Sequence, residues 1–148
     1  ALLSVMNESL RFHSTSALGL PRSLPPGGAV ICGKFFPGGS VVSVPAYTIH
    51  RDKEIFGADA EEYNPERWLA PGASKNFDKS FVPFSVGPRA CVGRNVAMME
   101  LAVIIASLVR RYDFELEEPQ AELKTLEGFL RKPVELPAGI RKRDVVKS

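Results

Sequence analysis

The 148-residue sequence has few of the residues that mark common classes of small protein: two cysteines, two histidines and one tryptophan. Cys32 and Cys91 are too few for a disulfide framework or a structural zinc site, and reduced thiols are typical of a cytosol-facing protein. The net charge is only +2, and Lys and Arg are scattered apart from the tail Arg141–Arg143. No nucleic-acid-binding surface is therefore expected. The hydrophobic share of 45% and charged share of 24% indicate a globular protein.

The sequence also lacks a long hydrophobic run. Its most apolar stretch, Val96–Val109, is interrupted by Glu100 and Ser107, and it is shorter than the roughly twenty residues that a bilayer requires. The first residues instead indicate a helix already under way, because apolar residues recur at helical spacing from Leu3 to Leu10 and no capping residue precedes them. We therefore expect the sequence to begin within a longer protein, with any membrane anchor outside these residues.

The first half of the sequence contains one helix and several short strands. Apolar spacing predicts a helix over Leu2–Phe12. Prolines and glycines then exclude a helix, and β-type runs follow at Ala29–Ile31, Lys34–Phe36 and Val41–Val44, separated by glycine-containing turns. We expect these runs to form one small antiparallel sheet, followed by a short helix over residues 48–57.

The second half contains an irregular segment and a long helix. Residues 60–80 have prolines, glycines and few periodic apolar residues, which predicts a long meander of functional importance. Apolar residues between Cys91 and about Tyr112 predict a long, largely buried helix. Residues 113–144 alternate apolar and polar residues around three prolines, which indicates strands or hairpins. The predicted fold class is mainly α with small β-sheets (α+β).

Cys91 lies in surroundings that favour a thiolate, the form in which cysteine acts as nucleophile or metal ligand. Arg89 and Arg94 flank it, and nearby cations lower the pKa of a thiol. The predicted helix would begin at about Cys91 and direct the positive end of its dipole toward the sulfur. The alternative is an inert buried cysteine at the start of a helix, because free cysteine is among the most often buried residue types.

The segment around Cys91 resembles a known family. Its pattern Phe84-x-x-Gly87-x-Arg89-x-Cys91-x-Gly93 is similar to the haem-binding loop of the cytochromes P-450, the haem-thiolate monooxygenases. The resemblance implies that Cys91 is the catalytic axial ligand of the iron. In this role an anionic sulfur increases electron density on iron and favours O–O cleavage. It further implies that Phe84 shields the sulfur and that Gly87 and Gly93 leave room for a large flat group.

The haem propionates require cationic partners, and the planar arginine side chain suits carboxylates. By the same resemblance, Arg89 is the first candidate. Arg22 occupies the place after the first helix where the family puts a second partner, although a loop arginine can also be merely solvated. His50 is not expected to be a second iron ligand, because oxygen must bind opposite the thiolate. The resemblance implies instead a structural role for His50 on a surface helix, and Cys32 is interpreted as structural.

Two further motifs agree with the family. Glu8-x-x-Arg11 lies on the first helix, and "NPERW" supplies Arg67. Alone, Glu8 and Arg11 would be an exposed pair of small effect. The resemblance implies that Glu8, Arg11 and Arg67 form a buried structural lock that holds the meander beneath the cysteine.

The resemblance also implies where a substrate binds. The segments concerned are Ser14–Leu20 and Thr125–Phe129, whose small and apolar residues suit a lipophilic or aromatic substrate. Ser14 and its two neighbours could orient a polar group of the substrate. Core packing of the same residues is the alternative.

Taken together, residues 1–148 are expected to be the C-terminal part of a cytochrome P-450 domain that lacks its N-terminal portion. The strings "GLPRSLPPGGAVICGKFFPGG", "NPERW" and "TLEGFLRKP" resemble the fungal benzoate 4-monooxygenase group. The family resemblance implies haem b, O2 and electrons from NADPH through a flavoprotein reductase. It implies location on the cytosolic face of the endoplasmic reticulum membrane through an anchor outside these residues. A haem-thiolate isomerase or dehydratase and a non-catalytic fragment remain alternatives, and the isolated chain is expected to be inactive.

Overall fold

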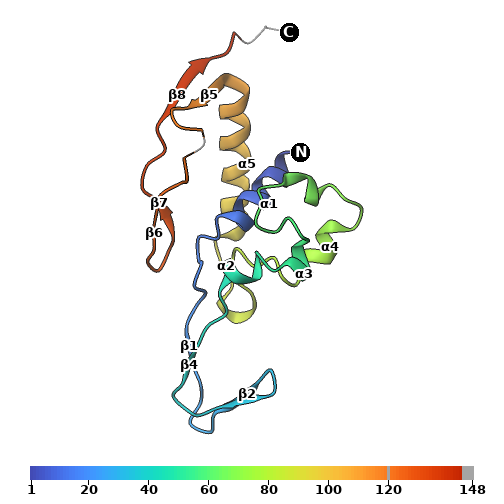
Figure 1. The fold of residues 1–148 in the computed structure, drawn as a ribbon, viewed down its shortest axis with the longest axis vertical. Coiled ribbons are helices and arrows are strands. Elements are labelled where there is room, and N and C mark those ends of the chain that lie inside the picture. Colours follow the sequence, from blue (N-terminus) through green and yellow to red (C-terminus); the bar gives the residue numbers. More distant parts are fainter. Residues whose placement is uncertain (120, 145–148) are drawn as a thin grey trace.

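The chain begins with helix α1 (Leu2–Phe12), the centre of the packed part of the molecule. The computed structural model describes residues 1–119 and 121–144. Helix α1 has the predicted bounds, and its inward face fully buries Met6, Glu8 and Arg11. It lies against the 3-10 helix η1 (Pro65–Trp68) and against the long helix α5 (Arg94–Arg111) (Figure 1).

Residues 19–45 form an arm that projects from this packed part (Figure 1). Strand β1 (Arg22–Ser23) pairs antiparallel with β4 (Val41–Val42), and β2 (Ala29–Ile31) pairs antiparallel with β3 (Lys34–Phe36). Cys32 and Gly33 form the turn of this second hairpin, both with positive φ angles of 49° and 76°. The strand runs predicted from sequence therefore exist, but they form two separate two-stranded sheets instead of one.

Short helices fill the segment after the arm. The predicted single helix over residues 48–57 is wrong: the structure has α2 (Ala46–Ile49) and α3 (Lys53–Phe56). The break occurs because Asp52 caps α3, accepting a hydrogen bond from the Glu54 N–H at 2.8 Å. The predicted meander contains η1 and α4 (Ala73–Phe77), joined by irregular chain.

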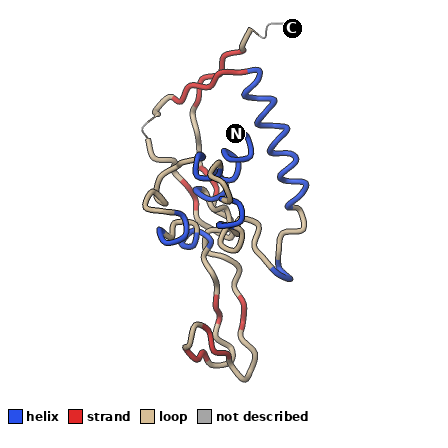
Figure 2. The backbone as a smooth tube through the Cα atoms, turned by 90° about the vertical axis from the view of Figure 1, so that its right-hand side faces the viewer, coloured by secondary structure: helices blue, strands red, loops and turns tan. Residues whose placement is uncertain are grey.

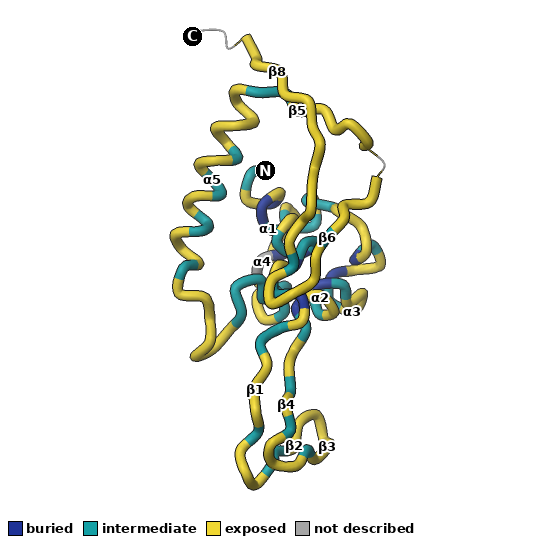
Figure 3. Tube along the Cα trace, turned by 90° about the vertical axis from the view of Figure 1, so that its left-hand side faces the viewer, coloured by how far each residue is buried: buried dark blue, intermediate teal, exposed yellow. Residues whose placement is uncertain are grey.

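Aromatic rings hold this segment together. Phe56 stacks on Phe77 with ring centroids 4.8 Å apart, and Trp68 contacts both Phe77 and Phe81 at 5.1 and 4.6 Å. The His50 ring lies 5.5 Å from that of Phe81. Such pairs stabilise a fold beyond their buried area. The fully buried residues consequently cluster around α1 and the short helices (Figure 3).

Helix α5 departs from two predictions. It begins at Arg94, not at Cys91, because residues 91–93 form a turn. It is also not buried: none of its residues is fully buried, and most of its surface is exposed (Figure 3). Arg110 and Arg111 lie in its last turn, as predicted, where the helix dipole favours cations.

The chain ends in two hairpin-like pairs beside α5 (Figure 2). Strand β5 (Tyr112–Leu116) pairs antiparallel with β8 (Ala138–Lys142), and β6 (Thr125–Leu126) with β7 (Lys132–Pro133). The described part of the chain contains helices and four small antiparallel sheets, which confirms the predicted α+β class. Within residues 1–119 and 121–144, no helix combines the length and the apolarity that crossing a bilayer demands.

Candidate functional site

Glu8 is the buried centre of a polar cluster, here called the Glu8 cluster: Glu8, Arg11, Arg67, Asn64 and Trp68. Arg11 donates two hydrogen bonds to the Glu8 carboxylate at 2.9 and 2.8 Å. Arg67 Nε donates to the same carboxylate at 3.1 Å, and Trp68 Nε1 and the Asn64 N–H each donate at 2.8 Å. The structure thus brings the three residues of the expected lock into direct contact.

Hydrogen bonds keep Glu8 ionised despite its burial. Burial alone would raise the pKa of Glu8, but hydrogen bonds from Arg11, Asn64 and Trp68 outweigh it and hold the pKa below its ordinary value. A buried carboxylate is stable only when its lone pairs are satisfied in this way. The cluster therefore joins α1 to η1 through charge-assisted hydrogen bonds.

The Arg11 guanidinium extends the cluster to the segment after α2. Its Nη1 donates to the carbonyl oxygens of His50 and Ala60, the latter at 2.7 Å, and its Nη2 donates to the Glu62 carbonyl at 2.8 Å. Arg11 is fully buried. One guanidinium therefore holds three points of a segment that lies 39 to 51 residues further along the chain.

Arg67 makes a second set of contacts on the other side of Glu8. Its Nη2 donates to Asp59 Oδ2 at 3.0 Å, and its Nη1 donates to the Phe56 carbonyl. Hydrogen bonds from Asn64 and from Arg67 lower the pKa of Asp59, while burial opposes the shift. Asp59 thus shares the charge of Arg67 with Glu8.

Cys91 lies in the cysteine loop, defined here as residues Phe81–Gly93. Its N–H donates to the carbonyl oxygen of Phe84 at 2.8 Å, which closes the loop. Between them lies the short 3-10 helix η2 (Gly87–Arg89). The Cys91 side chain is exposed and forms no disulfide. The structure therefore contradicts an inert buried cysteine at this position.

The two glycines of the cysteine loop differ in their backbone requirements. Gly87 has φ +70°, the left-handed region that favours glycine, and a Cβ there would meet nothing within 4 Å. Gly93 has an ordinary φ of −81°, and its added Cβ would lie 3.8 Å from Cys91 Sγ. The backbone thus explains the glycine at 87, whereas Gly93 keeps the space beside the sulfur open.

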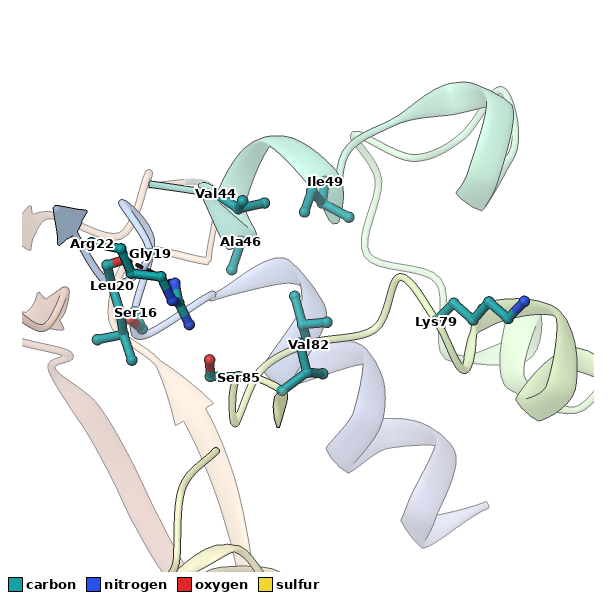
Figure 4. A pocket seen from close by; sticks show the side chains of 11 residues that line it. Ser16, Gly19, Leu20, Arg22, Val44, Ala46, Ile49, Lys79, Val82 and Ser85 are labelled. Carbon is teal, nitrogen blue, oxygen red and sulfur yellow. Dashed lines mark hydrogen bonds between the residues drawn. The ribbon is translucent and has the colours of Figure 1, made fainter. Parts of the chain in front are cut away.

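Arg22 and the start of the cysteine loop line one pocket of about 390 Å³ (Figure 4). Leu20, Val82, Ser85 and Val86 contribute to the same walls. Arg22 is exposed, and its Nη1 donates to the Leu20 carbonyl at 3.0 Å. The predicted Arg22 and the loop that carries Cys91 are therefore adjacent in the fold.

Arg89 and Arg94 lie on either side of Cys91 along the chain, and both are exposed. Arg89 is the last residue of η2, and Arg94 is the first residue of α5. Within the described ranges 1–119 and 121–144, neither forms an ion pair with a carboxylate. Both guanidiniums can therefore bind an anionic group.

The two predicted substrate segments also meet. The Arg131 N–H, close to the second segment, donates to the Thr15 carbonyl at 2.7 Å. Leu18, Tyr47 and Glu127 help to line a second pocket of about 390 Å³ between them. Ser14, however, is fully buried and donates to the Arg11 carbonyl at 2.9 Å. The expectation that Ser14 could orient a substrate group is therefore wrong.

Comparison with known proteins places the chain in a family. The family profile described as Cytochrome P450, written P-450 here, matches residues 2–137, which is most of the chain. The chain belongs to the cytochrome P-450 family. The resemblance seen in the cysteine loop is thereby confirmed, and cytochromes P-450 are haem proteins.

Several fungal cytochromes P-450 are similar to this chain. Benzoate 4-monooxygenase from Aspergillus niger is 52% identical over 141 residues, which is 94% of this chain and 27% of that protein. The cytochrome P-450 monooxygenase mpaDE from Penicillium roqueforti is 38% identical over 138 residues, 92% of this chain and 16% of that protein. Pisatin demethylase from Fusarium vanettenii is 37% identical over 132 residues, which is 89% of this chain and 26% of that protein. The chain thus spans about a quarter or less of the length of these relatives.

Sequence reasoning missed three residues of this cytochrome P-450 chain that contact the expected lock and misplaced a fourth, His50. Asn64 and Trp68 complete the Glu8 cluster, and Asp59 pairs with Arg67. Asn64 also accepts a hydrogen bond from the Glu66 N–H at 3.1 Å, a capping signal that the sequence carried before Pro65. His50 was expected on a surface helix, which is wrong, because it is fully buried directly after α2.

Proposed function

We propose that residues 1–148 are the C-terminal part of a fungal cytochrome P-450 domain, and that Cys91 is the thiolate axial ligand of haem b. The observation that carries this proposal is the position of Cys91. Its thiol is exposed at the end of a hydrogen-bonded loop, in a chain that matches the family over residues 2–137. An accessible sulfur is required of a metal ligand, and unlike the exposed Cys32, Cys91 lies in the family's cysteine motif.

The surrounding residues fit a large flat anionic cofactor. Gly93 places no side chain beside the sulfur, Gly87 permits the left-handed turn of the loop, and Phe84 is half-buried. Arg22 and Arg89 are exposed cations that would hold the two propionates. When bound, haem supplies the iron at which O2 is activated.

The proposed reaction inserts one oxygen atom of O2 into a C–H bond of a lipophilic or aromatic substrate. The second oxygen atom is reduced to water by two protons and two electrons. NADPH supplies the electrons through a flavoprotein reductase. The pocket between Ser14–Leu20 and Thr125–Phe129 would receive the substrate, and its lining includes Leu18 and Tyr47. The relative that is named a benzoate 4-monooxygenase supports an aromatic substrate. We propose the cytosolic face of the endoplasmic reticulum membrane as the location.

The spectrum of the reduced carbon-monoxide complex tests the ligand. The whole natural protein that contains these residues should give the strongly red-shifted Soret band of thiolate-bound haem. Cys91→Ala should abolish that band, whereas Cys32→Ala, which changes the other exposed cysteine, should leave it intact. A thiolate band that survives Cys91→Ala would refute the assignment. The 148-residue chain alone is expected to be inactive.

The dependence on cosubstrates tests the reaction class. Benzoate and a lipophilic non-aromatic compound would be incubated with the whole protein, O2, NADPH and a reductase. A monooxygenase gives a hydroxylated product whose formation requires both O2 and NADPH. Conversion of an organic hydroperoxide without O2 or NADPH would instead indicate a haem-thiolate isomerase or dehydratase.

A further inference from the structure

His50 connects the Glu8 cluster to the cysteine loop. Its side chain is fully buried. Its carbonyl oxygen accepts a hydrogen bond from Arg11 Nη1, while its ring Nε2 accepts one from the Val82 N–H at 2.9 Å. The backbone of one residue therefore contacts the cluster, and its side chain contacts the start of the loop that carries Cys91.

The hydrogen bonds of Ser14 determine the tautomer of the His50 ring. Ser14 Oγ has one hydrogen, which it donates to the Arg11 carbonyl at 2.9 Å. Its 2.7 Å contact with His50 Nδ1 therefore requires Nδ1 to be the donor. Since Nε2 accepts from Val82, the ring must be neutral, with its proton on Nδ1. Protonation of Nε2 would destroy the bond to the loop.

Three hydrogen bonds lead from His50 to Cys91. The Val82 N–H donates to His50, and the Val82 carbonyl accepts from the Ser85 N–H at 3.0 Å. The carbonyl of Phe84, between these two residues, accepts from the Cys91 N–H at 2.8 Å. The position of Val82 thus determines where the loop begins and, through Phe84, where Cys91 lies.

We propose that His50 is a positioning residue for the cysteine ligand: through Val82 it fixes the start of the cysteine loop against α1. This inference rests on the proposed function, because the group positioned is the haem thiolate. His50 would touch neither haem nor substrate. It acts only through the backbone of the loop.

The surroundings of His50 favour the neutral ring that this role requires. Burial lowers the pKa of His50 to about 4, and the nearby charges of Arg11 and Arg51 contribute to this shift. The polar backbone of Arg11 near the ring opposes this shift and raises the pKa. The rings of Phe56 and Phe81, which pack on the imidazole, carry no charge. At neutral pH, Nε2 is therefore available to accept the Val82 N–H.

The test compares two histidine substitutions in the haem-loaded whole protein. His50→Phe keeps an aromatic ring between Phe56 and Phe81 but removes both ring hydrogen bonds. His13→Phe is the matched control, because His13 is half-buried and its ring Nε2 makes a long 3.4 Å contact with the Arg131 carbonyl. The ratio of thiolate-bound to other haem is read from the reduced carbon-monoxide spectrum between pH 7 and pH 4.

At pH 7, His50→Phe should lower the thiolate ratio about tenfold, because the part-buried Val82 N–H loses its acceptor. As the pH falls toward 4, the thiolate ratio of wild type should fall as well, because the His50 ring becomes protonated. In His50→Phe the thiolate ratio should depend less on pH, because the variant has no imidazole at this position. His13→Phe should behave as wild type. A His50→Phe ratio within about twofold of wild type would overturn the inference.

Two further outcomes keep the test decisive. If His50→Phe fails to fold, Ser14→Ala replaces it: this variant removes one hydroxyl and should lower the ratio about threefold. An unchanged ratio in Ser14→Ala would then refute the positioning role. If wild type itself gives no thiolate band, the proposed function fails and the inference fails with it.

Discussion

Among the helices of residues 1–119 and 121–144, the two longest differ in what they bury. The 11-residue α1 fully buries a carboxylate and a guanidinium, Glu8 and Arg11. The 18-residue α5 is rich in apolar residues but fully buries none, and Met99 and Val103 are 62% and 61% exposed. Hydrogen-bonded charges and aromatic rings, together with Met6 and small apolar residues, therefore hold the packed part of this chain together, and the apolar face of α5 contributes little.

The cysteine loop lies between these two regions. Its start is bonded to the packed part through Val82, and its end leads directly into α5. The half of the loop that is hydrogen-bonded to buried groups should control its geometry. Substitutions in the packed region should consequently cost more than substitutions near Cys91 itself.

The largest effect is expected from Glu8→Ala. It leaves the buried guanidiniums of Arg11 and Arg67 without their shared carboxylate, which should cost about 3–5 kcal/mol of unfolding free energy. Urea denaturation of the whole protein measures the change. The control is Glu127→Ala, whose partner Arg131 and own side chain are partly exposed and whose removal should cost under about 1 kcal/mol. Equal losses in the two variants would contradict the contrast between the regions.

The second effect is acid sensitivity through His50. Its pKa falls from 6.5 to about 4 on folding, so the unfolded chain binds more protons in that window and stability decreases as the pH falls through it. The loss amounts to up to about 3 kcal/mol. Carboxylates with lowered pKa values, Glu8 and Asp59, lose their contribution only as the pH falls below their ordinary values of 4.5 and 3.8.

Urea denaturation between pH 7 and pH 4.5 therefore isolates the histidine. His50→Phe should flatten the pH dependence of the unfolding free energy in that range, whereas His13→Phe should preserve it. A slope that survives His50→Phe would assign the acid sensitivity to another group.

A smaller effect is expected at Gly87, in the exposed half of the cysteine loop. Gly87→Ala places a Cβ in the left-handed region and should cost about 1 kcal/mol. Gly27→Ala is the matched control, since a Cβ there also meets nothing within 4 Å but the φ angle is not positive. Indistinguishable urea midpoints for the two variants would show that the loop relaxes freely.

The sequence predicted best those elements that local patterns define. The bounds of α1 follow from the spacing of its apolar residues, and those of β2 and β3 follow from the Cys32–Gly33 turn. The Glu8-x-x-Arg11 and "NPERW" motifs also predicted that Glu8, Arg11 and Arg67 lie together, and the structure has them in contact. Short-range signals of this kind do not depend on the rest of the fold.

The sequence predicted poorly what distant contacts determine. The apolar residues of α5 predicted burial, but hydrophobicity alone does not specify a partner that covers them. The family resemblance placed His50 on a surface helix, and nothing in its local sequence indicates that Ser14 and Val82 hydrogen-bond to its ring. The start of α5 was misplaced by three residues because the turn over residues 91–93 has no strong local signal.

The smallest effect on stability, and the sharpest distinction between the regions, is expected for Gly93→Ala. Its backbone conformation suits any residue, and the added Cβ would make an ordinary 3.8 Å contact with Cys91 Sγ. The unfolding free energy should therefore change by less than about 0.5 kcal/mol. Haem content per protein should nevertheless fall, because the methyl group occupies space beside the sulfur that the proposed cofactor needs. If haem content stays at the wild-type value, Gly93 does not belong to the cofactor site. If the unfolding free energy falls by more than this amount, Gly93 is required for the fold, and the loop is more tightly constrained than its exposure indicates.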